Sequence, residues 1–217
     1  MPVTLERSGE VSILRFDDGE NRFTSAWLDE VDRALDDVVA QAPTALVTTG
    51  TGKFYSNGLD VDQLMTPGAA REAYLARVQR LLAKVLTLGV PTVAAVNGHA
   101  FGAGAMLALA HDFRVMNSEK GFFCLPEIDL KLSFAPGMAR LIQSKVTPAA
   151  AIEAMTTGRR YGGPDASAAA FVDAVAAPDE LETSAIERAA ALVGKDVPTL
   201  TAIKSELFTV AVEALRA

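Results

Sequence analysis

The spacing of hydrophobic residues changes along this chain from a two-residue repeat to a helical repeat. Residues 3–7 and 11–16 roughly alternate apolar and polar side chains, which predicts a β-hairpin with one face buried. Residues 21–24 are expected to form a loop, and residues 25–42 have the apolar spacing of an amphipathic helix. Residues 45–49 are apolar except for two threonines, so we expect a strand that is buried on both faces.

The middle of the chain repeats this order of strand and helix. A short helix to about Met65 and a long amphipathic helix over residues 70–88 precede a second apolar strand at 91–96. A run rich in Ala and Leu then has helical composition up to Ala110. Two further strands are expected at 113–116 and 122–125. Strands that alternate with helices in this way predict right-handed crossovers and a parallel sheet.

The pattern after Pro136 is mainly helical. A short apolar strand at residues 171–176 is the exception. The helices are expected at 137–145, 148–156, 165–170, 181–193 and 198–215.

Two glycine-rich turns stand out because each of them directly follows a predicted strand. Lys53–Val61 follows the strand at 45–49, and Asn97–Gly104 follows the strand at 91–96. Small residues allow another group to approach the backbone closely, and the first amides of the helix that follows have no intrahelical acceptor. Such amides favour an oxyanion, although a glycine-rich turn also serves simply to pack a helix tightly on a sheet. Two turns of this kind could aim two N–H groups at one point.

The two turns together resemble the oxyanion-hole motifs of the crotonase superfamily, also called the enoyl-CoA hydratase/isomerase family. The resemblance runs from about Val3 to the C-terminal helix and includes the Asn-Arg-Phe-Thr-Ser segment at 21–25 and Leu-Pro-Glu-Ile-Asp-Leu at 125–130. It implies an α/β fold of the ClpP/crotonase type, a spiral of ββα units with a helical C-terminal region. It also implies a core domain at 1–195 and a C-terminal helix at 196–217.

The family binds an acyl-CoA thioester so that the thioester carbonyl oxygen meets two backbone amides. The resemblance places these amides at Leu59 and Ala103. No separate cofactor is implied, because CoA is part of the substrate. The remaining positions that the resemblance brings into contact with acyl-CoA are Asn57, Gly58, Asp60, Gly102 and Met106.

Glu127 is the candidate acid/base. It follows Pro126 at the end of the apolar run Phe122–Leu125, so we expect a partly desolvated carboxylate with a raised pKa, as proton transfer near neutral pH requires. A glutamate after a proline is also a common helix cap or surface residue. The match to the family motif favours the catalytic interpretation.

The residue type at position 106 indicates which of two reactions of the family to expect. Enoyl-CoA hydratases, which this chain otherwise resembles here, carry a second glutamate at this position, and a methionine cannot activate water. The resemblance is strongest to monofunctional Δ3,Δ2-enoyl-CoA isomerases, which move the double bond of 3-enoyl-CoA to 2-trans-enoyl-CoA in fatty acid β-oxidation by moving a proton from C2 to C4. The alternatives are a hydratase, a thioesterase or another acyl-CoA reaction at the same oxyanion hole, and a non-catalytic acyl-CoA-binding protein.

Charge and composition narrow the possible partners. The 217 residues carry a net charge of −7, which argues against a nucleic-acid surface, and an anionic CoA must then be met by local amides and a few bases. The bases of the long helix form either a solvated face or, at one position, a contact with a CoA phosphate; they are Arg71, Arg77, Arg80 and Lys84. The apolar runs are too short to span a membrane.

Several other features point to a structural role or to a location. Asp60 is positioned to cap the short helix, Asp129 to orient a loop, and Glu153 to serve a structural role on a late helix. His99 and His111 lack further ligands at metal-binding spacing, so no metal is expected. The single Cys124 is expected to pack as a small apolar side chain.

The termini and the resemblance add expectations about location and assembly. Neither a secretion signal nor a peroxisomal address is recognised, which suggests the cytoplasm. The resemblance implies a homotrimer or hexamer. Family members extend further after the last helix, so the trimer and lid contacts are expected to be reduced.

Overall fold

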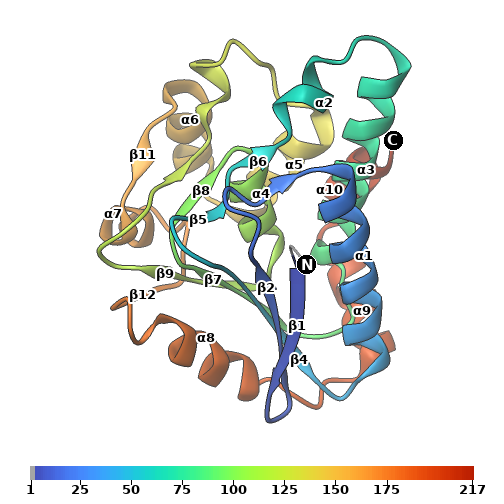
Figure 1. Ribbon diagram of the computed structural model, residues 1–217, viewed down its shortest axis with the longest axis vertical. Helices are drawn as coiled ribbons and strands as arrows, with labels where there is room; N and C mark the ends of the chain where they lie inside the picture. The colour runs from blue at the N-terminus through green and yellow to red at the C-terminus, as the bar shows by residue number, and fades with distance from the viewer. Residues whose placement is uncertain (1–2) are drawn as a thin grey trace.

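The computed structural model describes residues 3–217 and shows a large sheet with helices on both faces (Figure 1). The predicted hairpin is present as β1 (Val3–Ser8) and β2 (Val11–Phe16), which pair antiparallel. The remaining neighbours pair in parallel, in the order β1-β2-β4-β7-β9-β12. Their bounds are β4 (Ala45–Gly50), β7 (Thr92–Val96), β9 (Phe113–Asn117) and β12 (Ala174–Ala176). The predicted parallel sheet is therefore confirmed.

A smaller four-stranded sheet has the order β11-β10-β8-β5. Its strands are β5 (Phe54–Ser56), β8 (His99–Phe101), β10 (Phe123–Cys124) and β11 (Arg160–Tyr161). The chain passes from β4 to β5, from β7 to β8 and from β9 to β10, so each unit gives one strand to each sheet. Successive units stacked side by side form a spiral of ββα units.

The short strands differ from what the sequence suggested. Both glycine-rich turns contain strands, and the expected loop at 21–24 contains β3 (Arg22–Phe23), which pairs with β6 (Gly58–Leu59). Strands of two or three residues are too short to show an alternating pattern. Only their tertiary partners define them.

Helix α1 (Ser25–Ala40) begins where the side chain of Thr24 accepts a hydrogen bond from the Trp27 N–H at 3.2 Å. Its apolar stripe packs in the same core as that of α3 (Ala69–Leu86), and the short α2 (Val61–Met65) lies between them in the chain. Both predicted amphipathic helices are thus confirmed, with ends shifted by one or two residues.

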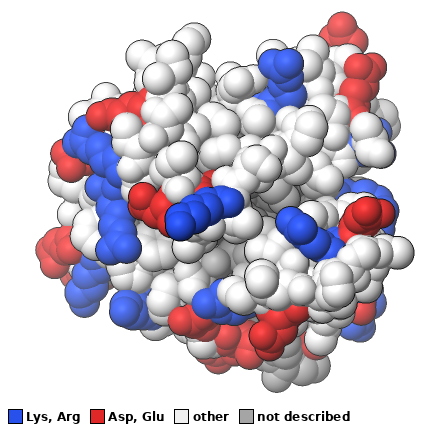
Figure 2. Space-filling view, turned by 90° about the horizontal axis from the view of Figure 1, so that it is seen from above, with Lys and Arg blue, Asp and Glu red and all other residues white. Residues whose placement is uncertain are grey.

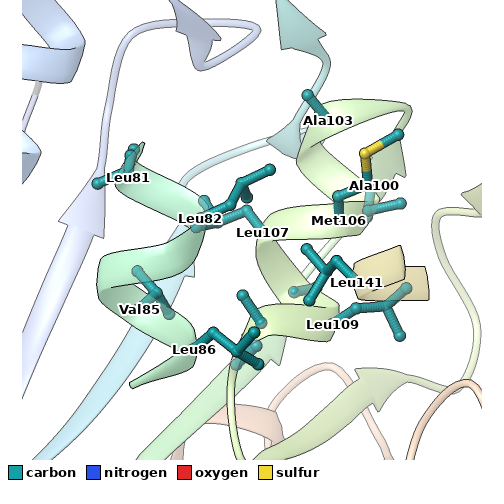
Figure 3. Close-up of a cluster of buried hydrophobic side chains, with 14 of the residues drawn as sticks. Leu81, Leu82, Val85, Leu86, Ala100, Ala103, Met106, Leu107, Leu109 and Leu141 are labelled. Atoms are coloured by element: carbon teal, nitrogen blue, oxygen red, sulfur yellow. The ribbon is translucent and has the colours of Figure 1, made fainter. Parts of the chain in front are cut away.

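Helix α4 (Ala103–Ala110) is buried along its whole length. Figure 3 shows Met106, Leu107 and Leu109 of this helix among the leucines and Val85 of α3 and Leu141 of α5 (Pro136–Lys145). A helix that is apolar on every side is stable only inside a core. The helix therefore forms the centre of the molecule, and its N-terminus is fixed by packing from all sides.

The opposite face of the large sheet is covered by α8 (Leu181–Ala190), below the strands in Figure 1. Ala185 and Ala189 of α8 pack against Val47 of β4 and Val93 of β7 in a second hydrophobic cluster. This layer explains why every residue of β4 is buried, as the sequence predicted.

The C-terminal region contains the expected helices with one difference. The single helix predicted for 198–215 is interrupted at Phe208 and forms two helices. The others are close to their predicted ranges, although β12 covers only half of the strand predicted at 171–176. The helices of this region not yet given are α6 (Pro148–Thr157), α7 (Gly163–Ala168), α9 (Val197–Leu207) and α10 (Thr209–Arg216). No helix within residues 3–217 is long and apolar enough to cross a lipid bilayer.

Lys204 of α9 attaches the C-terminal helices to the large sheet. The residue is 4% exposed, and Nζ donates to the carbonyls of Leu88 at 2.9 Å and Val90 at 3.0 Å and to Oδ2 of Asp112 at 2.7 Å. The same Asp112 oxygen accepts the Thr92 N–H at 2.8 Å. A buried charge with three acceptors holds α9 at the start of β7.

We predict that Lys204→Met lowers the free energy of unfolding by about 3 kcal/mol, because it leaves the Asp112 carboxylate and two carbonyls without their donor. Urea denaturation followed by circular dichroism measures the change. The matched variant Lys195→Met, at an exposed position, should change stability by less than about 0.5 kcal/mol. Equal stability of the two variants would show that the Lys204 contacts contribute little.

Candidate active site

The two glycine-rich turns are in direct contact. A β-carbon at Gly104 would overlap the carbonyl oxygen of Ser56, so only glycine allows α4 to approach the first turn this closely. Gly58 has a φ of +75°, and a β-carbon there would lie 2.9 Å from the Ala103 nitrogen. The N-terminus of α4 and the segment around Leu59 are therefore side by side, as the two-turn interpretation requires.

Side chains fix the first turn from several directions. Oγ of Ser56 accepts the Gly58 N–H at 3.0 Å and donates to the Asn21 carbonyl at 2.7 Å. Nη1 of Arg22 donates to the Leu59 carbonyl at 3.2 Å. The turn is thus held before any ligand binds, which is the condition for an efficient main-chain anion site.

A cavity of about 390 Å³ opens beside these two turns. Leu59, Ala103 and Met106 line it together with Glu127, and most of the remaining wall is apolar. Cavities of this size and composition are typical of small-molecule sites. The other lining residues are Arg22, Asn57, Val61, Leu64, Arg71, Leu75, Phe101, Gly102, Pro126, Leu130, Leu132, Ser133, Phe134, Ala135, Met138 and Arg160.

Two of the expected acyl-CoA contacts do not line this cavity. Gly58 lies behind the wall, against the Ala103 nitrogen. The Asp60 carboxylate accepts the Asp62 N–H at 3.1 Å and caps α2, and its second oxygen accepts from Gln63 at 2.8 Å. The capping role expected for Asp60 is therefore confirmed. Asn57 does line the cavity, while its Nδ2 donates to Glu20 at 3.1 Å.

Glu127 lies on η1 (Pro126–Ile128), a single turn that follows β10 directly. Its Oε2 is buried and has no hydrogen-bond partner among residues 3–217. Burial raises the pKa of the Glu127 carboxyl to about 7. A β-carbon on Gly102 would lie 3.3 Å from Oε1, so the carboxyl group faces the start of α4. The arrangement leaves a carboxyl group that can lose or gain a proton near neutral pH.

Met106 lies one turn into α4 and is 1% exposed. Its N–H donates to the Gly102 carbonyl at 3.0 Å, and the residue lines the cavity. A thioether neither donates a proton nor activates water. This part of the wall is therefore chemically inert.

Three arginines line the cavity, and of these only Arg71 was predicted from the sequence as a possible contact of CoA. The Arg160 guanidinium lies 5.7 Å from the ring centroid of Phe101. Figure 2 shows Lys and Arg side chains around a hollow on the upper face of the molecule. Arg22 lies within the recognised Asn-Arg-Phe-Thr-Ser segment, and Arg160 within a glycine-rich break between helices, but neither position has a pattern that points to the cavity.

The other bases of α3 serve different contacts. Arg77 pairs with Asp29 of α1 at 2.6 Å, and Lys84 pairs with Asp32 at 2.7 Å. These pairs bind α3 to α1 at a half-exposed boundary. Of the four bases noted in the sequence, only Arg71 lines the cavity.

The remaining candidates have structural surroundings. Glu153 accepts from the Tyr161 hydroxyl at 3.0 Å, and Sγ of Cys124 donates to the Gly158 carbonyl at 3.3 Å. Burial raises the pKa of the Cys124 thiol to about 11 and lowers the pKa of His111 to about 4. Within residues 3–217, no group of three or more His, Cys, Asp or Glu side chains is arranged to hold a metal ion.

Known proteins are similar to this chain in sequence and in fold. Residues 6–216 match the family described as Enoyl-CoA hydratase/isomerase. The chain is 33% identical over 187 residues to enoyl-CoA delta isomerase 2, peroxisomal, of Arabidopsis thaliana, which covers 82% of this chain and 78% of that protein.

Solved structures show the same architecture. The probable enoyl-CoA hydratase EchA3 of Mycobacterium tuberculosis superposes with a TM-score of 0.92 at 26% identity, covering 100% of this chain and 92% of that one. Human mitochondrial delta3-delta2-enoyl-CoA isomerase gives 0.90 at 19% identity, with 98% and 85% covered, a likeness of fold alone.

The spiral of ββα units and the cavity at the start of α4 therefore define a crotonase-fold protein. The chain belongs to the enoyl-CoA hydratase/isomerase family, as its motifs suggested.

We predict that Glu127→Gln becomes more stable relative to the wild type as pH rises, because the pKa of Glu127 is raised in the folded protein. The unfolded carboxyl ionises near 4.5 and the folded one near 7, so between these values the wild type loses stability that the glutamine variant keeps. The difference in unfolding free energy should grow by up to about 3 kcal/mol between pH 4 and pH 8 and then level off. Urea denaturation of both proteins across this range measures it.

Glu153→Gln is the matched control, because hydrogen bonds from Arg159 and Tyr161 lower the pKa of Glu153. Its stability relative to the wild type should not rise with pH. Parallel pH profiles for Glu127→Gln and the wild type would mean that Glu127 is not desolvated.

Proposed function

We propose that this protein moves the double bond of a 3-enoyl-CoA to give 2-trans-enoyl-CoA. The observation that carries the proposal is the composition of the cavity wall. Glu127 is the only carboxylate among the described residues that line it, and Met106 occupies the wall at the start of α4. One proton carrier in an apolar cavity suits an isomerisation better than the addition of water.

The thioester carbonyl oxygen would accept hydrogen bonds from the N–H groups of Leu59 and Ala103. Ala103 is the first residue of α4, so its N–H has no acceptor within the helix. When a proton leaves C2, negative charge moves onto the thioester oxygen and a dienolate forms. One main-chain donor at such an oxygen is worth about 3 kcal/mol of transition-state stabilisation.

Glu127 would carry the proton from C2 to C4. As a carboxylate it takes the C2 proton, the double bond moves from C3–C4 to C2–C3 as the dienolate collapses, and the same proton bonds to C4. A pKa of about 7 lets one carboxyl group act as a base and then as an acid without a large cost in either step. Met106 and the leucines of the wall would keep water away from the dienolate.

Hydration of a 2-enoyl-CoA is the second candidate. The M. tuberculosis protein EchA3, which shares the fold, is described as a probable enoyl-CoA hydratase in one structure and as an enoyl-CoA isomerase in another, so the fold alone does not separate the reactions. Similarity to the Arabidopsis delta isomerase supports the first candidate. The expected homotrimer or hexamer and the cytoplasmic location stay predictions.

The direct test supplies the protein with a 3-enoyl-CoA and, separately, with a 2-trans-enoyl-CoA. We expect conjugated product from the first, seen as a rise in ultraviolet absorbance, and slower loss of conjugation from the second. Glu127→Gln should lower kcat for isomerisation by at least about a hundredfold, because the general base is lost. Glu153→Gln, a glutamate outside the cavity, should retain activity.

Two outcomes would replace the proposal. Water addition faster than isomerisation would make the protein a hydratase. Binding of both thioesters without turnover of either would make it a non-catalytic acyl-CoA-binding protein.

The arginines of the cavity wall suggest where the phosphates of CoA bind. The protein carries a net charge of −7, yet Arg71 and Arg160 line the cavity and form no salt bridge within the described part of the chain. A free guanidinium at the cavity is suited to a phosphate. Arg22 is less available because it pairs with Glu20 at 2.6 Å.

We predict that Arg160→Ala raises KM for an acyl-CoA about tenfold and leaves kcat nearly unchanged, since one hydrogen bond to a charged group contributes about 1.5 kcal/mol. Steady-state kinetics measure both constants. Arg140→Ala, on the exposed side of α5, is the control. With a 3-enoyl-pantetheine thioester, which has no nucleotide phosphates, Arg160→Ala and the wild type should have the same KM. A persistent difference there would place Arg160 at the acyl group.

A further inference from the structure

Side chains hold both ends of the peptide unit between Leu59 and Asp60. Its carbonyl accepts from Nη1 of Arg22 at 3.2 Å, and its N–H donates to the hydroxyl of Tyr74 at 2.8 Å. Arg22 comes from β3 and Tyr74 from α3, two elements that are far apart in the sequence. Because both its carbonyl and its N–H are hydrogen-bonded, this peptide unit cannot rotate without breaking a hydrogen bond.

The rest of the turn is held before this peptide begins. The Asn57 N–H donates to the Glu20 carbonyl at 2.8 Å, and the Gly58 N–H to Oγ of Ser56 at 3.0 Å. β6 itself has only two residues. One of them is Gly58, and a glycine restricts the backbone less than any other residue. The orientation of Leu59 therefore depends on its following peptide as well as on the preceding ones.

Tyr74 is suited to hold an N–H beside a developing negative charge. Its side chain is 4% exposed, and burial raises the pKa of the phenol to about 12, so it is neutral at physiological pH. A carboxylate acceptor in the same place would repel an enolate, whereas a neutral hydroxyl does not. The nearby Asp60 carboxylate is already occupied by the Asp62 N–H and the Gln63 amide.

Tyr74 also connects the turn to the substrate cavity. Arg71 and Leu75, on either side of it in α3, both line the cavity. Helix α3, which borders the cavity, therefore also holds the peptide that follows Leu59. The hydrogen bond from the Asp60 N–H to Tyr74 therefore joins the turn at Leu59 to the helix that forms part of the cavity wall.

We propose that Tyr74 is a positioning residue that fixes the direction of the Leu59 N–H through its hydrogen bond with the Asp60 N–H. The proposal rests on the function proposed above and identifies a residue on which that function depends. Tyr74 is not among the residues that line the cavity. It acts through the main chain.

Tyr74→Phe tests this directly, because the ring stays and only the hydroxyl is removed. We expect kcat for 3-enoyl-CoA isomerisation to fall between about tenfold and a hundredfold, as small misplacements of catalytic groups do, with KM changed less than about twofold. Tyr161→Phe is the matched control: it removes the hydroxyl of another buried tyrosine, which contacts Glu153 away from the cavity, and should retain kcat.

A ligand readout separates positioning from a general loss of structure. A 3-oxoacyl-CoA ionises to an enolate with its own ultraviolet band, and the main-chain donors should favour this form. Tyr74→Phe should weaken enolate binding by the same factor as kcat, while the affinity for a saturated acyl-CoA stays within about twofold. Equal losses for both ligands would contradict the positioning role.

A second pair of variants breaks the same hydrogen bond from its donor side. Asp60→Pro removes the N–H, and the φ of −72° at Asp60 suits a proline ring, which prefers about −65°. Asp60→Ala keeps the N–H and removes only the helix cap. Relative to Asp60→Ala, Asp60→Pro should lose the same factor in kcat as Tyr74→Phe, and the double variant Asp60→Pro/Tyr74→Phe should lose nothing further.

Wild-type kcat in Tyr74→Phe, or independent losses in the double variant, would overturn the proposal while leaving the isomerase intact. If Tyr74→Phe does not fold, the comparison of Asp60→Pro with Asp60→Ala decides. If the wild type shows no isomerisation, the proposed function fails on its own, and the enolate band still reports whether Tyr74 positions the donor.

Discussion

The close contact between the start of α4 and the turn before β6 is the constraint on which the site depends. Gly104 faces the Ser56 carbonyl and Gly58 faces the Ala103 nitrogen, at separations that leave no room for a β-carbon. Because α4 is buried on every side, its N-terminus cannot shift to relieve a larger residue. The position of two main-chain segments is thus set by the core of the protein rather than by a flexible loop.

The Glu127 carboxyl group is arranged at a cost to stability. It has a buried oxygen without a partner in the described chain, beside a wall formed mainly by leucines and other apolar side chains. An unsatisfied polar group of this kind destabilises a fold by a few kcal/mol, and it persists because the surrounding core is large. Glu30 Oε2 and Arg188 Nε are also buried without a hydrogen-bond partner in the described chain, whereas the buried ammonium of Lys204 has three acceptors. Of these unpartnered groups, only the Glu127 carboxyl lines the cavity, where a proton carrier can reach a ligand.

Long periodic segments were predictable from the sequence, and contacts between distant segments were not. The apolar stripes of α1 and α3 and the doubly buried β4 follow from local patterns. The apolar run at 122–125 also predicted β10, which covers Phe123–Cys124. The strands β5 and β8 have three residues each, too few for a pattern, and are defined by their pairing in the small sheet. Arg160 and Tyr74 lack any local signal, since their roles depend on residues far away in the chain.

The sequence by itself determined the order of the large-sheet strands and the long helices, the two glycine-rich turns and the identity of Glu127 as a residue worth testing. Each of these depends on neighbouring residues only: the spacing of apolar side chains, the presence of glycines, or a short sequence motif. The tertiary structure alone decided that both turns meet, that Met106 and Glu127 share one cavity and that Tyr74 and Arg22 hold the same peptide. These relations join segments separated by many residues, and only the packing of the whole core fixes distances of that kind.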